Sequence, residues 1–196
     1  MSLFQPRDPS DVSALVQAYP LCWVVSGQAN DRYATPLPLL PEQNAGGNVV
    51  SLFGHIARSN PQQRALERDP IATILCMGPQ GYISPRLVSS PQWGPTWNYA
   101  VCRFETEVRF VPEQTEEALW RLAAVLEGKD ADAWTPDRMG ARYHQLKQRI
   151  VAFRATVLET QARFKLGQDE DDVVFRDIVD RLGDRALADW MSRTRS

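Results

Sequence analysis

The sequence is poor in the residues that bind metals. It has two histidines and three cysteines in 196 residues, and neither type occurs at the short spacings that metal ligands use. His55 and His144 lie far apart, and Cys22, Cys76 and Cys102 form no CxxC pair. We therefore expect no metal site. Because each cysteine lies within an apolar run, we interpret all three as buried reduced thiols rather than a disulfide framework.

Signatures of the large enzyme classes are also missing. The chain contains no GxSxG elbow, no P-loop and no GxGxxG fingerprint. Hydrolase, NTPase and Rossmann functions therefore have little support. No residue stands out as an essential acid or base, because a single histidine at a strand end, such as His55, is more often structural than catalytic. No catalytic residue is predicted.

The charge and the hydropathy exclude further classes. The formal net charge is −2, so no overall positive field attracts the chain to nucleic acid or to an anionic membrane. No apolar run approaches the ~20 residues that a membrane helix needs. The first residues lack the cationic start and apolar stretch of a secretory signal. We expect a cytoplasmic protein whose hydrophobic content of 43% is ample for a packed core.

The hydrophobic pattern favours strands in most of the chain. β-Branched and aromatic runs between turn formers predict strands over residues 21–27, 33–40, 49–54, 71–77, 82–84, 95–111 and 150–160. The intervening turns are short, and residues 78–81 form one of them. This order favours an antiparallel barrel over a parallel sheet, and the length of strand 95–111 suggests a bent barrel strand.

Helical patterns flank these strands. They cover residues 9–19, where Asp8 caps the first turn, and 60–68, 115–126, 135–149, 173–182 and 184–191. The predicted fold class is α+β, mainly β. We expect a single domain over residues 1–196, with a barrel formed by 1–111 and 150–168, a helical insertion at 113–149 and C-terminal helices at 169–196.

One helix start has the features of an anion site. Asn60 is a good N-cap, Pro61 suits the first helical position, and Gln63 can close a capping box onto Asn60. The helix N-terminus offers backbone N–H groups and a partial positive charge, and Arg58 adds a guanidinium that matches phosphate geometry. The residues predict a phosphate-bearing ligand here, and the alternative is an ordinary capped helix start.

Two other patterns leave alternatives open. Pro36 and Pro38 are spaced so that their missing N–H donors fall on the same side of a strand, which indicates an edge or a side that faces a ligand. Trp97 and Tyr99 flank Asn98, and they either pack in the core or form a platform for an aromatic ligand ring. Core packing is the simpler interpretation of that pattern.

Several motifs resemble the PaiB family of FMN-binding negative transcriptional regulators. They are Gly-His-Ile-Ala-Arg-Ser-Asn-Pro-Gln at residues 54–62, Pro-Thr-Trp-Asn-Tyr at 95–99, and shorter segments at 34–40, 78–85, 150–153 and 165–168. The order is collinear and spans nearly the whole chain. The chain departs from the family pattern in four places: Pro36 replaces a histidine, Gly167 and Asp169 replace a serine and an asparagine, and residues 86–94 replace a loop that usually carries aromatic residues and lysine.

The resemblance implies an FMN-binding split β-barrel with flanking helices and a helical C-terminal segment. It also implies a homodimer with two FMN molecules at the subunit interface, and it assigns Arg58 and the backbone near Ser59 to the phosphate. The cofactor-binding residues that it implies are Thr35, Leu37, His55, Ile56, Ala57, Arg58, Ser59, Asn60, Gln62, Thr96, Trp97, Asn98, Lys165 and Gln168.

The function that the resemblance implies is negative transcriptional regulation by an FMN-binding homodimer. Affinity for DNA depends mainly on phosphate neutralisation, and the overall acidic charge gives DNA contact weak support. Regulation through a protein partner is an alternative. A flavin-dependent oxidoreductase of a small molecule, or a module that binds flavin for sensing or storage, also fits the same residues.

Overall fold

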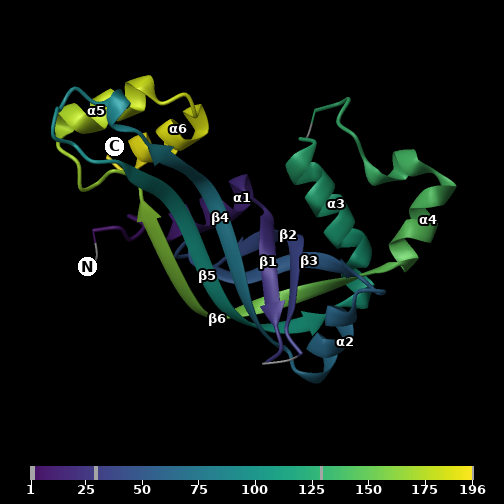
Figure 1. Cartoon of the computed structure of the whole chain (residues 1–196). Coiled ribbons are helices and arrows are strands. Elements are labelled where there is room, and N and C mark those ends of the chain that lie inside the picture. The colour runs from purple at the N-terminus through teal and green to yellow at the C-terminus, as the bar shows by residue number, and fades with distance from the viewer. Residues whose placement is uncertain (1–2, 29–30, 129, 196) are drawn as a thin grey trace.

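The computed structural model describes residues 3–28, 31–128 and 130–195. Six antiparallel strands close into a barrel in the order β1-β2-β3-β6-β5-β4 (Figure 1). They are β1 (Leu21–Ser26), β2 (Tyr33–Gln43), β3 (Val49–Ala57), β4 (Ile71–Ile83), β5 (Thr96–Phe110) and β6 (Ile150–Lys165). The predicted antiparallel barrel in a mainly β, α+β fold is confirmed.

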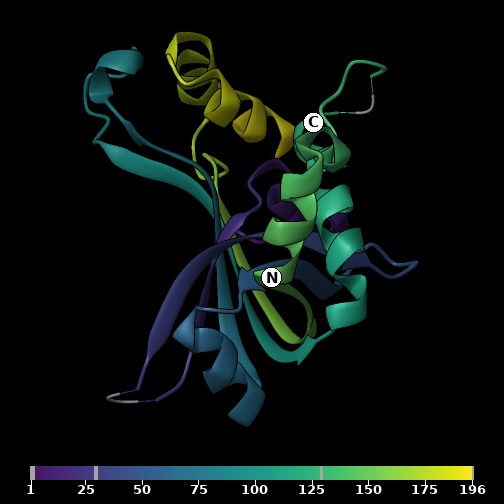
Figure 2. The same ribbon diagram turned by 90° about the vertical axis from the view of Figure 1, so that its right-hand side faces the viewer.

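Helices cover the barrel at several places. They are α1 (Pro9–Ala18), α2 (Pro61–Arg68), α3 (Thr115–Leu126), α4 (Ala141–Gln148), α5 (Asp172–Arg181) and α6 (Arg185–Arg193). α2 lies at one end of the long strands and α5 with α6 at the other, as Figures 1 and 2 both show. None of these helices, within the described ranges, is long and apolar enough to cross a membrane.

One hydrophobic core fills the barrel and continues beneath the helices. It runs from Val12 and Leu15 of α1 through Phe104 of β5 and Phe164 of β6 to Met191 of α6, all of which are buried. Inward and outward residues alternate along β5, as a half-buried strand requires, whereas Val151, Ala152 and Phe153 of β6 are all buried. The C-terminal helices are therefore part of the same core as the barrel.

Four strands and one helix differ from the sequence-based expectation. β2 continues to Gln43, β3 to Ala57 and β6 to Lys165, because all three keep their neighbours as ladder partners. Residues 78–81 are not a turn: the β4–β5 register shifts between Met77 and Gln80, so the segment is a bulge inside β4. The expected helix over 135–149 is divided by Gly140, whose φ of +56° no ordinary helical residue adopts.

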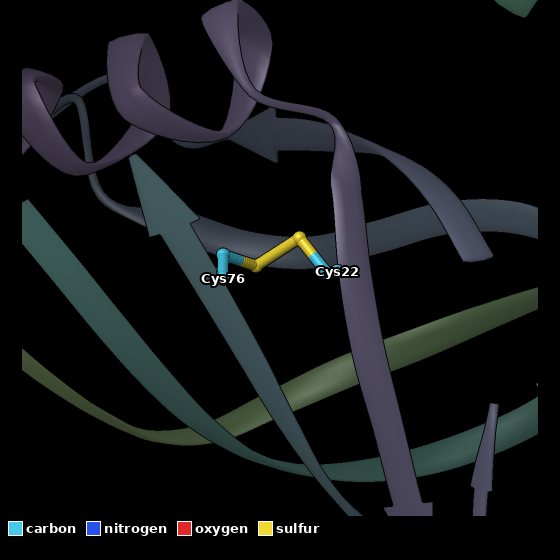
Figure 3. The surroundings of a disulfide bond; sticks show 2 residues. All are labelled: Cys22 and Cys76. Carbon is cyan, nitrogen blue, oxygen red and sulfur yellow. A yellow bond between two sulfur atoms is a disulfide. The ribbon is translucent and has the colours of Figure 1, made fainter. Parts of the chain in front are cut away.

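The expectation of three reduced cysteines is wrong for two of them. Cys22 of β1 and Cys76 of β4 form a disulfide with a Cα–Cα distance of 4.5 Å (Figure 3). Barrel closure pairs Trp23 with Leu75 and thereby places the two cysteines opposite each other. Cys102 is free and buried, as expected. The described residues contain no group of His, Cys, Asp and Glu that could hold a metal ion.

Candidate functional site

The barrel opens where β2 and β3 separate. Their ladder ends at the pair Leu39 and Gly54, although β2 stays paired with β1 and β3 stays paired with β6. The Leu39 N–H donates to the Pro20 carbonyl at 2.8 Å, so the donors of odd-numbered β2 residues face β1. Pro36 and Pro38 therefore lack donors on the side that faces β3, and the predicted edge is confirmed. We call this opening the β2–β3 split.

Gly54 stands at the vertex of the split. A Cβ atom at this position would lie 2.5 Å from Cδ2 of Leu39 and 2.9 Å from the Pro38 carbonyl oxygen. The second contact is with backbone, which cannot rotate away. Glycine is required here because the strands approach so closely just before they part.

The split brings together nine of the predicted cofactor-binding residues. Leu37 and Ile56 are buried, while Thr35 and His55 are half-buried and Ala57 is exposed. The turn that follows β3 closes the split, because Nδ2 of Asn60 donates to Oγ1 of Thr35 at 3.1 Å. The nine residues that lie on β2, β3 and the start of α2 are Thr35, Leu37, His55, Ile56, Ala57, Arg58, Ser59, Asn60 and Gln62.

Asn60 caps the start of α2, as the sequence predicts. Oδ1 of Asn60 accepts from the Gln62 N–H at 2.9 Å, the Gln63 N–H donates to the Asn60 carbonyl, and Pro61 has no N–H. The predicted capping box is wrong, because the Gln63 amide donates to Glu67 instead. The helix therefore offers an anion its dipole rather than a row of free N–H groups.

Free donors remain just before this helix. Among the described residues, neither the Arg58 guanidinium nor the Ser59 N–H and hydroxyl makes a hydrogen bond or an ion pair, and both residues are exposed. The Arg58 side chain borders a cavity of about 200 Å³ that is also lined by Glu113, Glu116 and Lys147. Arg58 is thus an unpaired cation at the end of β3, in a position suited to a phosphate.

Two buried polar atoms beside the split lack partners in the described chain. Gln62 is fully buried, and its Nε2 donates to the Val24 carbonyl at 2.9 Å and to Oγ of Ser26 at 3.0 Å, but its Oε1 is unpaired. Nδ1 of His55 is buried and unpaired as well. Burial lowers the pKa of His55, so its imidazole is neutral at pH 7. Unpaired buried atoms are rare, and those at the split fit a ligand with its own donors and acceptors.

The other predicted residues lie around the start of β5 and the end of β6. Nζ of Lys165 donates to Oγ1 of Thr96 at 2.6 Å and to the Trp97 carbonyl at 3.3 Å. The Gln168 amide folds back onto its own segment, where it donates to the Phe164 carbonyl at 2.5 Å and accepts from the Leu166 N–H at 2.7 Å. Lys165 is thereby held against β5.

Trp97 and Asn98 occupy opposite sides of β5. The expectation that Trp97 packs in the core is wrong, because its side chain points outward, is 51% exposed and donates to Oε1 of Gln80 at 2.7 Å. Asn98 points inward, is 1% exposed and lies beneath α6, with Nδ2 at 3.5 Å from Sδ of Met191. This arrangement presents Trp97 to a ligand and does not present Asn98.

The sequence analysis missed Tyr82 as a neighbour of this site. Its ring centroid lies 6.0 Å from that of Trp97, and both rings are about half exposed. The two residues are ladder partners in β4 and β5. The sequence places Tyr82 and Trp97 in two predicted strands, but only the register between β4 and β5 shows that the two rings meet.

The two groups of residues lie at opposite ends of the barrel. β6 connects them: Ile150 pairs with Ala57 at the split, and Lys165 pairs with Tyr99 at the far end. At about 3.3 Å per residue, the length of β6 separates them by up to about 50 Å. One chain therefore does not bring all fourteen predicted residues to a single ligand.

Comparison with known proteins identifies the family. The model described as "Putative FMN-binding domain" matches residues 2–159. The chain is 25% identical over 183 residues to the protease synthase and sporulation protein PAI 2 of Bacillus subtilis. The aligned region covers 91% of this chain and 86% of that protein.

Solved structures share the fold at low sequence identity. A flavocytochrome from Azotobacter vinelandii superposes with a TM-score of 0.61 and 13% identity, covering 81% of this chain and 68% of that one. An FAD and heme binding protein from Mycobacterium smegmatis gives a TM-score of 0.59 and 14% identity, covering 90% of this chain and 79% of that one. The family match over residues 2–159 shows that the chain belongs to the PaiB-like FMN-binding family, whose cofactor is FMN.

Proposed function

We propose that this chain acts as a homodimer that binds two FMN molecules and serves as a PaiB-like regulator. Each FMN lies between the β2–β3 split of one protomer and the Trp97–Lys165 end of its partner. The observation that carries this proposal is the separation of the two groups of residues along β6. A two-fold axis places the far end of one chain against the split of the other, which completes two equivalent sites.

An exposed apolar face supports the dimer. Leu21 and Trp23 of β1 and Leu75 and Met77 of β4 point outward, and Leu21 and Met77 are 63% and 60% exposed. A cavity of about 610 Å³ opens on this face. Trp97 also faces outward, so the face continues toward the far end of β5. Apolar surface of this kind marks an interaction site on a protein, and a second copy of the chain fits it.

Within the split, each residue has a distinct role toward FMN. Arg58 and Ser59 bind the phosphate, and the dipole of α2 adds to the attraction. His55 and Gln62 supply hydrogen-bonding atoms that the chain leaves unpaired, while Leu37 and Ile56 form an apolar wall. Bound FMN supplies electron or hydride transfer through its ring system.

The C-terminal arginines do not form a free basic surface for DNA. The Arg181 guanidinium donates to the Leu87 carbonyl and pairs with Asp177. Arg195 pairs with Asp172 and donates to the carbonyl groups of Gly167 and Glu170, in the loop that precedes α5. Because such contacts occupy these cations, phosphate neutralisation gains little from them. We therefore favour regulation through a protein partner over direct repression at DNA.

A second candidate function is a flavin-dependent oxidoreductase of a small molecule. His55 favours it, since a neutral imidazole with an unpaired Nδ1 beside the split can exchange a hydrogen bond with a reacting group. Steady consumption of NAD(P)H by the FMN-loaded protein tests this candidate. A rate equal to that of free FMN counts against it.

Two measurements test the primary proposal. The FMN-loaded protein should show the absorbance of bound oxidised flavin, and light scattering should give twice the chain mass of 22.2 kDa. A monomer with bound FMN would contradict the shared site. A gel-shift titration at low salt then separates the routes of regulation, because sequence-preferring binding would contradict regulation through a protein partner alone.

A further inference from the structure

Three cysteines lie side by side in the barrel wall. Cys22, Cys76 and Cys102 belong to β1, β4 and β5, which are consecutive strands of the sheet. All three are buried in the core cluster, so their side chains point to the same, inner side. Cys76 forms the disulfide with Cys22, and it is also the direct ladder partner of Cys102.

This register gives Cys76 two partners at disulfide spacing. Directly opposed residues of an antiparallel pair have Cα atoms about 4.5–5.5 Å apart, within the range that a disulfide spans. The Cα–Cα distance of 4.5 Å between Cys22 and Cys76 lies within this range. Cys22 and Cys102 are two strand spacings apart, about 9.5 Å, which is beyond the reach of a disulfide. The fold thus permits two disulfides and forbids the third.

The seam closed by the disulfide is the shortest ladder of the barrel. β1 and β4 share four residue pairs, from Trp23 and Leu75 to Ser26 and Ala72. β4 and β5 share eleven pairs, so a bond between them adds little constraint. Moving the disulfide from Cys22 to Cys102 would therefore release β1 from β4 and leave the β4–β5 pairing intact.

We propose that Cys22, Cys76 and Cys102 form a disulfide-exchange site, in which Cys76 bonds either to Cys22 or to Cys102 and thereby ties or releases the β1–β4 seam. In the exchange, the Cys102 thiolate attacks Sγ of Cys76. The Cys76–Cys102 bond forms as the Cys22–Cys76 bond breaks, and Cys22 leaves as a thiolate that takes up the proton lost by Cys102. The exchange involves no net oxidation.

An external dithiol extends the same chemistry. It reduces the Cys22–Cys76 bond to two thiols and is itself oxidised to a disulfide, after which reoxidation by a small-molecule disulfide can pair Cys76 with either neighbour. Burial raises the pKa of the Cys102 thiol to about 12, so this group stays protonated while the barrel is closed. Exchange therefore proceeds through opening of the short seam.

The seam adjoins the cofactor residues. β1 carries Val24, whose carbonyl accepts from Gln62 and whose ladder partner is Thr35. Release of β1 would therefore loosen Gln62 and Thr35, which both contact Val24. This consequence for FMN rests on the function proposed above, whereas the exchange itself does not.

Disulfide mapping tests the exchange on the full chain. The protein is reduced with a dithiol, reoxidised with oxidised glutathione, alkylated and digested for mass spectrometry. Cys22→Ala should form the Cys76–Cys102 bond, Cys102→Ala should form the Cys22–Cys76 bond, and Cys76→Ala should form neither. Circular dichroism checks that each variant is folded. Two free thiols in folded Cys22→Ala, or a Cys22–Cys102 bond in any folded variant, would overturn the proposal.

An FMN titration tests the coupling to the cofactor. Folded, oxidised Cys22→Ala should bind FMN with a several-fold higher Kd than oxidised Cys102→Ala, which keeps the seam tied. Equal Kd values with the mapped bonds as expected would overturn the coupling and leave the exchange site supported. Absence of FMN binding in the unaltered protein would refute the proposed function, and the mapping would still decide the exchange.

Discussion

The role of Arg58 gives the most specific prediction for the cofactor. The guanidinium makes no hydrogen bond or ion pair with the described chain, so Arg58→Ala removes no intrachain interaction and should leave the melting temperature unchanged. Its contact with the FMN phosphate would be a charged hydrogen bond, worth about 1.5–3 kcal/mol. We therefore expect the Kd for FMN to rise between about 10-fold and 150-fold.

Fluorescence titration with two ligands separates this role from others. Riboflavin lacks the phosphate, so Arg58→Ala should weaken FMN binding and leave riboflavin binding unchanged. Arg64→Ala removes an equal charge from an exposed position on α2 and is the matched control. An unchanged Kd for FMN in Arg58→Ala, or an equal loss for FMN and riboflavin, would refute the phosphate assignment.

Three further predictions concern stability. Gly54→Ala should destabilise the fold by about 1–3 kcal/mol, because the new Cβ meets the Pro38 carbonyl, and thermal melting should show it. Burial opposes ionisation of Glu42, but hydrogen bonds from two arginines hold its pKa below the usual value; the stabilisation that follows is present above about pH 4.5 and is lost as the pH falls below that, and Glu42→Gln should flatten this acid limb. Reduction of the Cys22–Cys76 disulfide, which closes a separation of 54 residues, should lower the free energy of unfolding by about 4 kcal/mol in a denaturant titration. Contrary results would be, respectively, an unchanged melting temperature, an unchanged acid limb and an unchanged denaturation midpoint.

Local signals in the sequence predicted most of the strands and caps. Alternating apolar residues and turn formers are local, so the strands of the barrel and the caps of Asp8 and Asn60 follow from short segments. The spacing of Pro36 and Pro38 even predicted an edge, because proline removes a donor whatever the rest of the chain does.

Features that depend on which strands meet could not be read in this way. Residues 78–81 contain two glycines and a proline, but β5 pairs with β4 as far as Met77 and again from Gln80, which keeps the strand continuous. The Cys22–Cys76 disulfide requires closure of β1 onto β4, which no local pattern encodes. The side of β5 on which Trp97 lies depends on α6, which covers Asn98 on the other side.

The candidate site likewise has one part that a short segment of sequence specifies and one part that depends on distant contacts. The motif around Arg58 and Asn60 is continuous in the sequence, and the structure keeps its residues together at the split. Trp97 and Lys165 are also brought together, but at the other end of β6. In the proposed dimer a second copy of the chain brings the two ends together, and no pattern within a single chain specifies that relation.

A mixed dimer tests the shared FMN site most directly. Chains with Arg58→Ala and chains with Trp97→Ala carry different tags, are co-expressed, and the heterodimer is purified through both tags. If each site combines the split of one protomer with the far end of the other, both homodimers bind FMN weakly, while the heterodimer has one unaltered site and should bind one FMN per dimer with the unaltered Kd. A heterodimer that binds no FMN at the unaltered Kd would contradict a site shared between subunits.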